Sequence, residues 1–146
     1  MLLFRQNFMV FAWLHFTYRT YTTRQEKIGV AFGNGSYIPY SEEAKRLLDP
    51  KWSDTYALLG AKLIETIVEP MIELQFDCEE YVILKTMALF LPDNQLSNEG
   101  RRITAQMREV LTKALSIHIE RRFPLLNHLQ KSQRCMNLTL LIPPLM

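Results

Sequence analysis

The segment that begins at Asp77 constrains the fold more than any other part of this sequence. Asp77 and Glu80 form an N-terminal capping pattern: each side chain can bond an amide at the helix start, and the helix dipole favours both charges. The residues from Tyr81 to Leu91 are apolar on nearly every side of a helix, with Lys85 as the main exception. A helix without a polar face needs neighbours on several sides. We therefore expect this helix to lie buried between layers.

A second apolar segment, from Met1 to Tyr18, opens the chain. Arg5 and His15 interrupt it and leave too short an apolar run to cross a bilayer. No small-residue cleavage site follows, so a secretory signal is not indicated. We favour a buried helix that fades at about Tyr21, and a membrane anchor is the less favoured alternative.

Residues 28–39 predict a β-hairpin, because Gly33-Asn34-Gly35 separates two short runs of β-type residues. Pro39 cannot donate to a sheet ladder, so the second strand should lie at an edge. A lone hairpin is marginal in water and must pack on the helices.

The rest of the chain is predicted to be helical. A short helix is expected over residues 41–48, a long one from about Ser53 with a kink at Pro70, one over 97–123, and a last one from about Leu125 that stops at Pro143. The inward stripe of the 97–123 helix is predicted from its apolar spacing to be Ile103, Met107, Val110, Leu111, Ala114 and Leu115. The expected class is all-α, with about five helices and one hairpin.

Charge and composition exclude several functions. Seventeen basic residues against fifteen acidic ones give a net charge of +2, which cannot hold nucleic acid by charge alone. The two cysteines, Cys78 and Cys135, are better explained as reduced thiols than as one bridge. His15, His118 and His128 are too scattered for a metal motif, and no nucleophile, base and orienting group can be assembled. We expect no enzyme activity, no catalytic residue, no metal and no cofactor.

Several motifs resemble one family. The segment from Leu2-Leu3 to Arg19-Thr20 is similar to the fused fourth and fifth helices of nuclear receptor ligand-binding domains. Glu79-Glu80-Tyr81-Val82-Ile83-Leu84-Lys85, followed by Ala88-Leu89-Phe90-Leu91-Pro92-Asp93, resembles the eighth helix of that family. Residues 96–101 and 107–119 resemble the ninth helix, and residues 134–141 resemble the tenth. The resemblance covers nearly the whole chain.

The resemblance implies that residues 1–146 are the central part of a divergent, orphan-type receptor ligand-binding domain. They would form part of a three-layer antiparallel helical sandwich with one small hairpin. The family's DNA-binding domain, first three helices and terminal activation helix have no counterpart in this sequence. The implied function is regulation of transcription, in the nucleus or cytoplasm, without direct DNA binding or a membrane. Implied partners are a small lipophilic ligand and a second receptor, as a homodimer or heterodimer.

Site residues are also implied by the resemblance. In the family, one face of the first helix lines the ligand pocket, and Phe8, Met9, Ala12, Phe16 and Arg19 lie there. The alternative, which we favour, is that core side chains fill this face and Arg19 is solvated. Glu79 or Glu80 is expected to form a structural ion pair with Arg108 or Arg134, and Glu80 can serve as a capping residue at the same time.

The dimer surface of the family lies on the outer faces of its ninth and tenth helices. The corresponding residues here are Arg121, Arg122, His128, Lys131, Gln133 and Leu138. An ordinary solvated face explains the polar members equally well. The alternative function is a helical interaction scaffold without a ligand, including a truncated or dominant-negative receptor. Because apolar helices would remain partly exposed, the isolated chain is expected to be poorly soluble or oligomeric.

Overall fold

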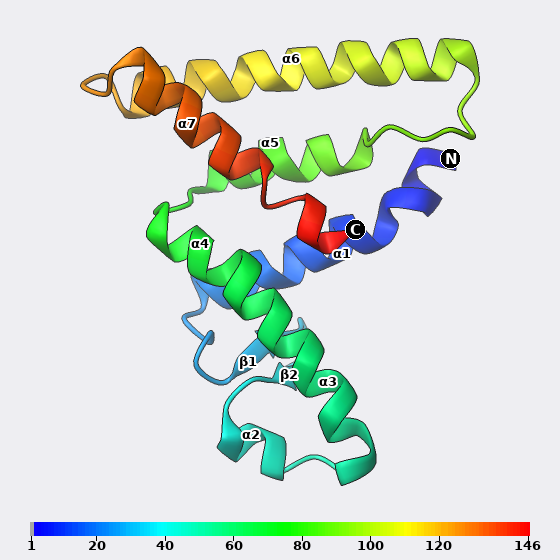
Figure 1. Cartoon of the computed structure of the whole chain (residues 1–146), viewed down its shortest axis with the longest axis vertical. Coiled ribbons are helices and arrows are strands. Elements are labelled where there is room, and N and C mark those ends of the chain that lie inside the picture. The colour runs from blue at the N-terminus through cyan, green and yellow to red at the C-terminus, as the bar shows by residue number, and fades with distance from the viewer. Residues whose placement is uncertain (1) are drawn as a thin grey trace. The chain divides into compact units, whose positions relative to one another are not determined.

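The computed structural model describes residues 2–146, apart from the side chains of Leu2, Gln6 and Ser53. The described chain is mostly helical and contains one two-stranded antiparallel sheet (Figure 1). This confirms the expected all-α class with one hairpin. The elements in order are α1 (Leu2–Thr22), β1 (Gly29–Ala31), β2 (Tyr37–Pro39), α2 (Glu42–Arg46), α3 (Pro50–Leu63), the π-helix η1 (Ile64–Val68), α4 (Glu69–Glu73), α5 (Cys78–Leu89), α6 (Asn98–Arg122), α7 (His128–Thr139) and the 3₁₀-helix η2 (Pro143–Leu145).

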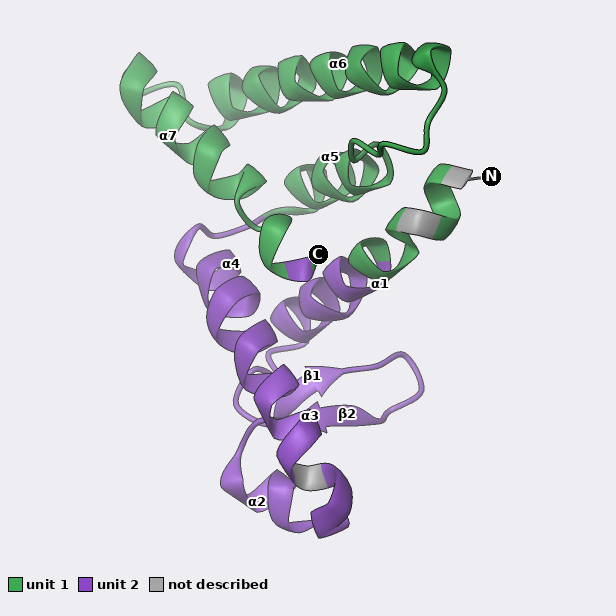
Figure 2. Ribbon diagram, turned by 45° about the vertical axis from the view of Figure 1, so that its right-hand side comes forward, with its two compact units in different colours: residues 1–11, 77–144, 146 green, residues 12–76, 145 purple. Residues whose placement is uncertain are grey.

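The chain divides into two compact units (Figure 2). Unit 1 comprises Met1–Phe11, Asp77–Pro144 and Met146, and unit 2 comprises Ala12–Phe76 and Leu145. The division falls inside α1. Each unit has its own buried apolar residues: Leu84, Met87, Leu115, Ile119 and Leu138 in unit 1, and Leu14, Val30, Leu63, Ile67 and Met71 in unit 2.

Helix α1 buries one face and exposes another. The buried residues Asn7, Val10, Leu14, Thr17 and Thr20 recur three or four positions apart. The exposed face carries Phe4, Phe8 and Met9, about half exposed at 52%, 47% and 55%. The expected burial of this first helix therefore holds for one face only. No described helix is both long and apolar enough to cross a membrane.

The hairpin forms where it was predicted, with Val30 opposite Ile38 in the antiparallel register. Gly35 supplies a positive φ of 86° in the turn. The Ala31 amide donates to the Thr20 hydroxyl at 2.8 Å, which ties the hairpin to α1 within unit 2.

The long helix begins at Pro50 and not near Ser53. Asp49 caps it by accepting from the Lys51 amide at 2.9 Å, and proline suits the first helical position. The predicted irregularity near Pro70 takes the form of a π segment, in which the Glu69 amide donates to the Ile64 carbonyl. Because Pro70 has no amide hydrogen, the regular ladder cannot continue through it.

Helix α5 starts with the predicted capping box, since Asp77 accepts from the Glu80 amide at 2.7 Å and Glu80 accepts from the Asp77 amide at 3.1 Å. One side of the helix is open to solvent, where Val82 is 55% exposed. Complete burial of α5 is therefore not what the structure shows. Its neighbours in unit 1 are mainly α6 and α7, and they leave this side uncovered.

The inward face of α6 agrees only in part with the stripe that its apolar spacing predicts, since Leu115 is buried and Met107, Leu111 and Ala114 are half-buried. Ile103 and Val110 are 46% and 58% exposed, so they lie outside the core. An inward row of six residues, Thr104, Arg108, Leu111, Leu115, His118 and Arg122, is spaced alternately four and three positions apart, and Ile119 beside it is also buried. Four of these six are polar, and three of the four, Arg108, His118 and Arg122, have polar partners in unit 1.

Helix α7 begins at His128, three residues later than predicted. Asn127 and Gln130 form a second capping box, with bonds of 2.9 and 3.0 Å between side chain and backbone. The helix ends at Thr139, and η2 follows at the predicted proline pair.

Candidate functional site

Six charged or titratable side chains meet in unit 1, where α5 begins and α6 ends. We call them the ionic cluster: Asp77, Glu79, Glu80, His118, Arg122 and Arg134. Three elements supply them: α5 and its N-cap Asp77 contribute the carboxylates, α6 contributes His118 and Arg122, and α7 contributes Arg134.

Glu80 is the centre of the ionic cluster, and its side chain is fully buried. Arg134 donates through Nε and Nη2 to Oε1 at 2.9 and 2.7 Å, and Nη2 also reaches Oε2 at 3.0 Å. Arg122 donates to Oε2 at 3.0 Å. A buried carboxylate is costly unless it is paired and fully hydrogen-bonded, and two guanidiniums and a backbone amide satisfy this one.

Asp77 joins the helix cap to the ionic cluster. Its Oδ1 caps α5, and its Oδ2 lies 2.8 Å from His118 Nε2 and 2.9 Å from Arg122 Nη1. Burial alone would raise the pKa of Asp77. The hydrogen bonds from the Glu80 amide and His118, with the charge of Arg122, outweigh burial and lower that pKa.

His118 lies between two carboxylates and is 8% exposed. Its Nε2 faces Asp77 at 2.8 Å, and its Nδ1 faces Glu79 at 2.5 Å. Carboxylates accept hydrogen bonds and do not donate them when ionised, so a protonated imidazolium can bond both and a neutral ring only one. His118 therefore connects the start of α5 to the last turns of α6.

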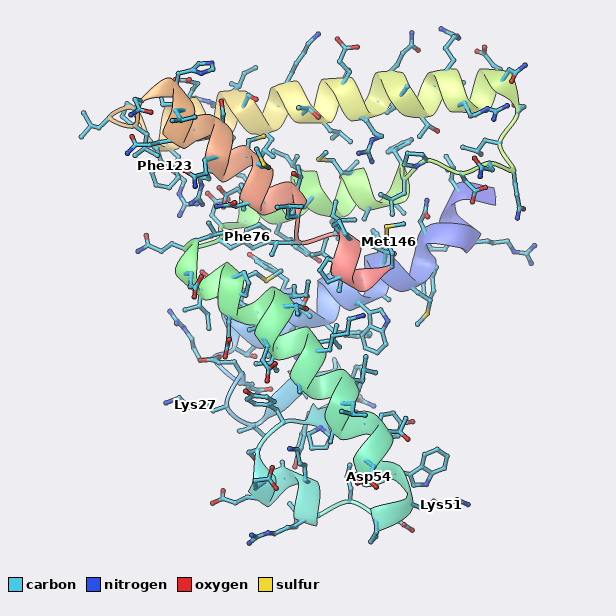
Figure 3. All side chains as sticks on the ribbon, in the orientation of Figure 1. Lys27, Lys51, Asp54, Phe76, Phe123 and Met146 are labelled. Carbon is cyan, nitrogen blue, oxygen red and sulfur yellow. The ribbon has the colours of Figure 1, made fainter. Side chains whose placement is uncertain are left out.

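Phe123, labelled in Figure 3 where α6 ends, gives the two arginines an aromatic surface. The guanidinium carbons of Arg122 and Arg134 lie 4.9 and 4.4 Å from its ring centroid. These cation–π contacts orient both guanidiniums towards Glu80 without adding another carboxylate.

Three members of the cluster have the chemistry of metal ligands. Ligand atoms of Asp77, Glu80 and His118 lie within 4.8 Å of one another. Arg122 already donates to both carboxylates, at 2.9 and 3.0 Å. A metal ion would have to displace this guanidinium, so the arrangement is explained as an ion-pair network.

The structure brings together some of the predicted ion-pair residues. Glu80 and Arg134 are in direct contact, and Glu79 contacts His118. Arg108 lies elsewhere, donating to the Phe90 carbonyl at 3.5 Å. Sequence reasoning did not place His118 in any site, and it assigned Arg122 to the dimer surface instead of the ion pair. His118 and Arg122 follow Leu115 by three and seven positions, so they lie on the same face of α6 as this buried leucine. That spacing could have indicated that both side chains turn inward.

The predicted ligand-binding residues do not form one enclosed surface. Phe8, Met9 and Arg19 are exposed, and Ala12 is half-buried. Phe16 packs edge-on against Phe32 of the hairpin, with ring centroids 4.7 Å apart.

Unit 2 contains an apolar cavity near Phe16, with a volume of about 260 Å³. None of the five predicted ligand residues lines it. The lining residues are Trp13, Phe32, Tyr37, Ile38, Pro39, Leu48 and Tyr56. Trp13 was the residue to suspect in the sequence, since it precedes Phe16 by one helical turn.

The predicted dimer residues divide between surface and interior. Arg121, His128 and Gln133 are exposed. Leu138 is fully buried and belongs to the core, and Arg122 is held by the ionic cluster. Lys131 pairs with Glu120 across α6 and α7. Leu138 lies on the opposite side of α7 from Leu129, so the outer face of that helix is made of other residues.

The described elements are a long first helix, a hairpin and then successive helices. A family model described as the ligand-binding domain of nuclear hormone receptor matches residues 1–146. The chain belongs to this family, which is not a family of enzymes.

A curated relative is the Caenorhabditis elegans protein named "Nuclear hormone receptor family member nhr-100". It is 28% identical over 118 residues, which cover 81% of this chain and 26% of that protein. This chain therefore spans about a quarter of the length of the relative.

Proposed function

We propose that this chain acts in the regulation of transcription as a dimerisation module of a nuclear receptor. The observation that carries the proposal is an exposed apolar face on α7 and its C-cap residue Leu140, where Leu129, Met136 and Leu140 are 76%, 60% and 56% exposed. Their spacing of seven and four places them on one side of the helix, with the exposed Gln133 between them. Family membership supports a nuclear location and a second receptor domain or a second copy as the partner.

The α7 face is suited to a partner because apolar side chains lie beside polar ones. Exposed apolar patches rimmed by polar residues are typical of protein interfaces. His128 and Gln133 provide such a rim. The ionic cluster supports the proposal indirectly, since Arg134 anchors the opposite side of α7 to Glu80 at 2.7 Å and keeps the apolar face outward.

The test replaces one apolar residue of the α7 face with an acid. We expect Leu129→Glu to abolish dimers of the full chain in sedimentation-velocity experiments, because the charge would be desolvated in the interface. Leu58→Glu is the matched control, since Leu58 is a leucine of equal exposure, 76%, in unit 2. Wild-type chain that stays monomeric at high concentration, with and without a receptor partner, contradicts the proposal. Equal loss of dimers in both variants also contradicts it.

Ligand sensing is the second candidate function, and the 260 Å³ cavity of unit 2 favours it. Aromatic and aliphatic side chains line most of this cavity, as expected for a lipophilic ligand. A lipophilic compound that raises the melting temperature supports sensing, because a ligand stabilises the state that binds it. A chain that dimerises without such stabilisation fits the alternative of an interaction scaffold.

A further inference from the structure

A second cavity lies in unit 1, between the loop that follows α5 and the first half of α6. Its volume is about 360 Å³. Pro92, Leu96 and Ala105 provide apolar walls, and Arg101, Thr104 and Arg108 provide polar groups. The three polar residues are spaced three and four apart, so they lie on one face of α6.

The hydroxyl of Thr104 has no hydrogen-bond partner, although the residue is only 3% exposed. A buried polar group without a partner costs free energy and calls for an explanation. Most threonines at such a helical position bond a carbonyl of the preceding turn, as Thr17 and Thr112 do at 2.9 and 2.8 Å. Threonine populates two side-chain rotamers in helices, so the Thr104 hydroxyl can turn towards a ligand in the cavity without backbone movement.

The two arginines give the cavity a positive side. Arg101 donates to the Asn98 side chain at 2.8 Å, and Arg108 donates to the Phe90 carbonyl at 3.5 Å. Among the ion pairs between described residues, none involves either arginine. Asp93 also lines the cavity, but its Oδ1 accepts from the Gln95 amide at 2.6 Å. Arg108 is half-buried, so its guanidinium lies beside the apolar walls formed by Pro92, Leu96 and Ala105.

We infer that this cavity binds a small organic carboxylate with a compact apolar body. The carboxylate bonds the guanidinium of Arg108, with Arg101 and the Thr104 hydroxyl as further donors. The apolar body packs against Pro92, Leu96 and Ala105. A planar guanidinium matches a carboxylate well, and the apolar walls weaken competition from water. The inference is independent of dimerisation through α7 and of the cavity in unit 2.

The test compares an acid with a neutral compound of the same shape. Calorimetric titration of the full chain uses 1-naphthaleneacetate and its amide, 1-naphthaleneacetamide. We expect the acid to bind at least about tenfold more tightly, since a charge-assisted hydrogen bond outweighs a neutral one. Arg108→Gln should remove the preference. Arg102→Gln should keep it, because Arg102 is a neighbouring arginine outside the cavity that pairs with Glu99 at 2.6 Å.

Thr104→Val separates binding from folding. Valine keeps the shape and removes a hydroxyl that has no partner, so this variant should bind the acid several-fold more weakly without losing thermal stability. Equal affinity for acid and amide, an unchanged preference in Arg108→Gln, or no binding of either compound would overturn the inference. A lower melting temperature for Thr104→Val would show that the Thr104 hydroxyl has a partner within the chain, and would overturn its assignment as a ligand donor.

Discussion

At the scale of residues, the most consequential side chain is Glu80. Its charge is removed from water and compensated by Arg122 and Arg134, which come from two later helices. Such a pair adds little net stability compared with an apolar equivalent, but losing one partner is costly. The glutamate therefore holds α5, α6 and α7 in one arrangement within unit 1.

Glu80→Gln tests this role. The substitution leaves Arg134 buried beside a neutral amide, so we expect a loss of about 3–5 kcal/mol in the free energy of unfolding. Glu120→Gln is the matched control, since Glu120 is 58% exposed and pairs with Lys131 on the surface. Its loss should be about 0–1 kcal/mol. Urea denaturation of both variants measures the difference, and equal losses would show that Glu80 is not the anchor.

Lys85 shows how a charge is accommodated on an otherwise apolar helix. Its ammonium lies 4.2 Å from the ring centroid of Phe11 and 5.2 Å from that of Tyr81. Asn7 bonds the Leu89 carbonyl at 3.0 Å nearby in the same unit. Lys85, the charged exception on α5, therefore makes a contact between α5 and the first half of α1.

At the scale of elements, two glycines of the hairpin differ in what surrounds them. A Cβ on Gly29 would lie 2.1 Å from the Ile38 carbonyl oxygen of the facing strand, whereas a Cβ on Gly33 would meet nothing within 4 Å. Real Cβ atoms do not approach a backbone oxygen this closely, so the strands must separate to admit alanine.

Gly29→Ala should therefore destabilise the chain by about 1–3 kcal/mol, the usual cost of forcing extra volume into a packed site. Gly33→Ala should change stability by less than about 0.5 kcal/mol, as for a surface substitution. Thermal unfolding followed by circular dichroism compares the two. A stable Gly29→Ala variant would mean that β1 and β2 are not paired in the observed register.

The observed helix boundaries show which of them could be predicted from neighbouring residues in the sequence. The capping box of α5 and the Gly-Asn-Gly turn were predicted, because a few neighbouring residues suffice to define them. The starts of α3 and α7 were misplaced by about three residues. Asp49 before Pro50, and Asn127 before Gln130, were equally local signals that the apolar spacing obscured.

At the scale of the whole molecule, stability should depend on pH through the ionic cluster. The pKa of Asp77 is lower in the folded chain than in the unfolded chain. The unfolded state therefore binds a proton first as the pH falls. The stabilisation from Asp77 is complete above the unfolded pKa of about 4 and is lost as the pH falls through the folded value.

We expect the difference in unfolding free energy between wild type and Asp77→Asn to be largest near neutral pH and to shrink below about pH 4. Asparagine is a suitable control substitution because it can still cap α5 while it cannot bear the charge. Urea denaturation between pH 3 and pH 7 measures the difference. A difference that stays constant over this range would contradict the charged role of Asp77.

The sequence by itself determined the helical class, the hairpin, the start of α5 and the receptor family, since short-range patterns encode all four. Only the tertiary structure decided which polar residues of α6 turn inward and where the cavities beside Trp13 and Thr104 lie. Apolar spacing favoured Ile103 and Val110, yet His118 and Arg122 lie inside. The physical reason is that the partners of these two residues, Asp77 and Glu80, lie about 40 positions earlier in the chain. The free energy of burying a charge depends on such distant partners, which a local pattern does not contain.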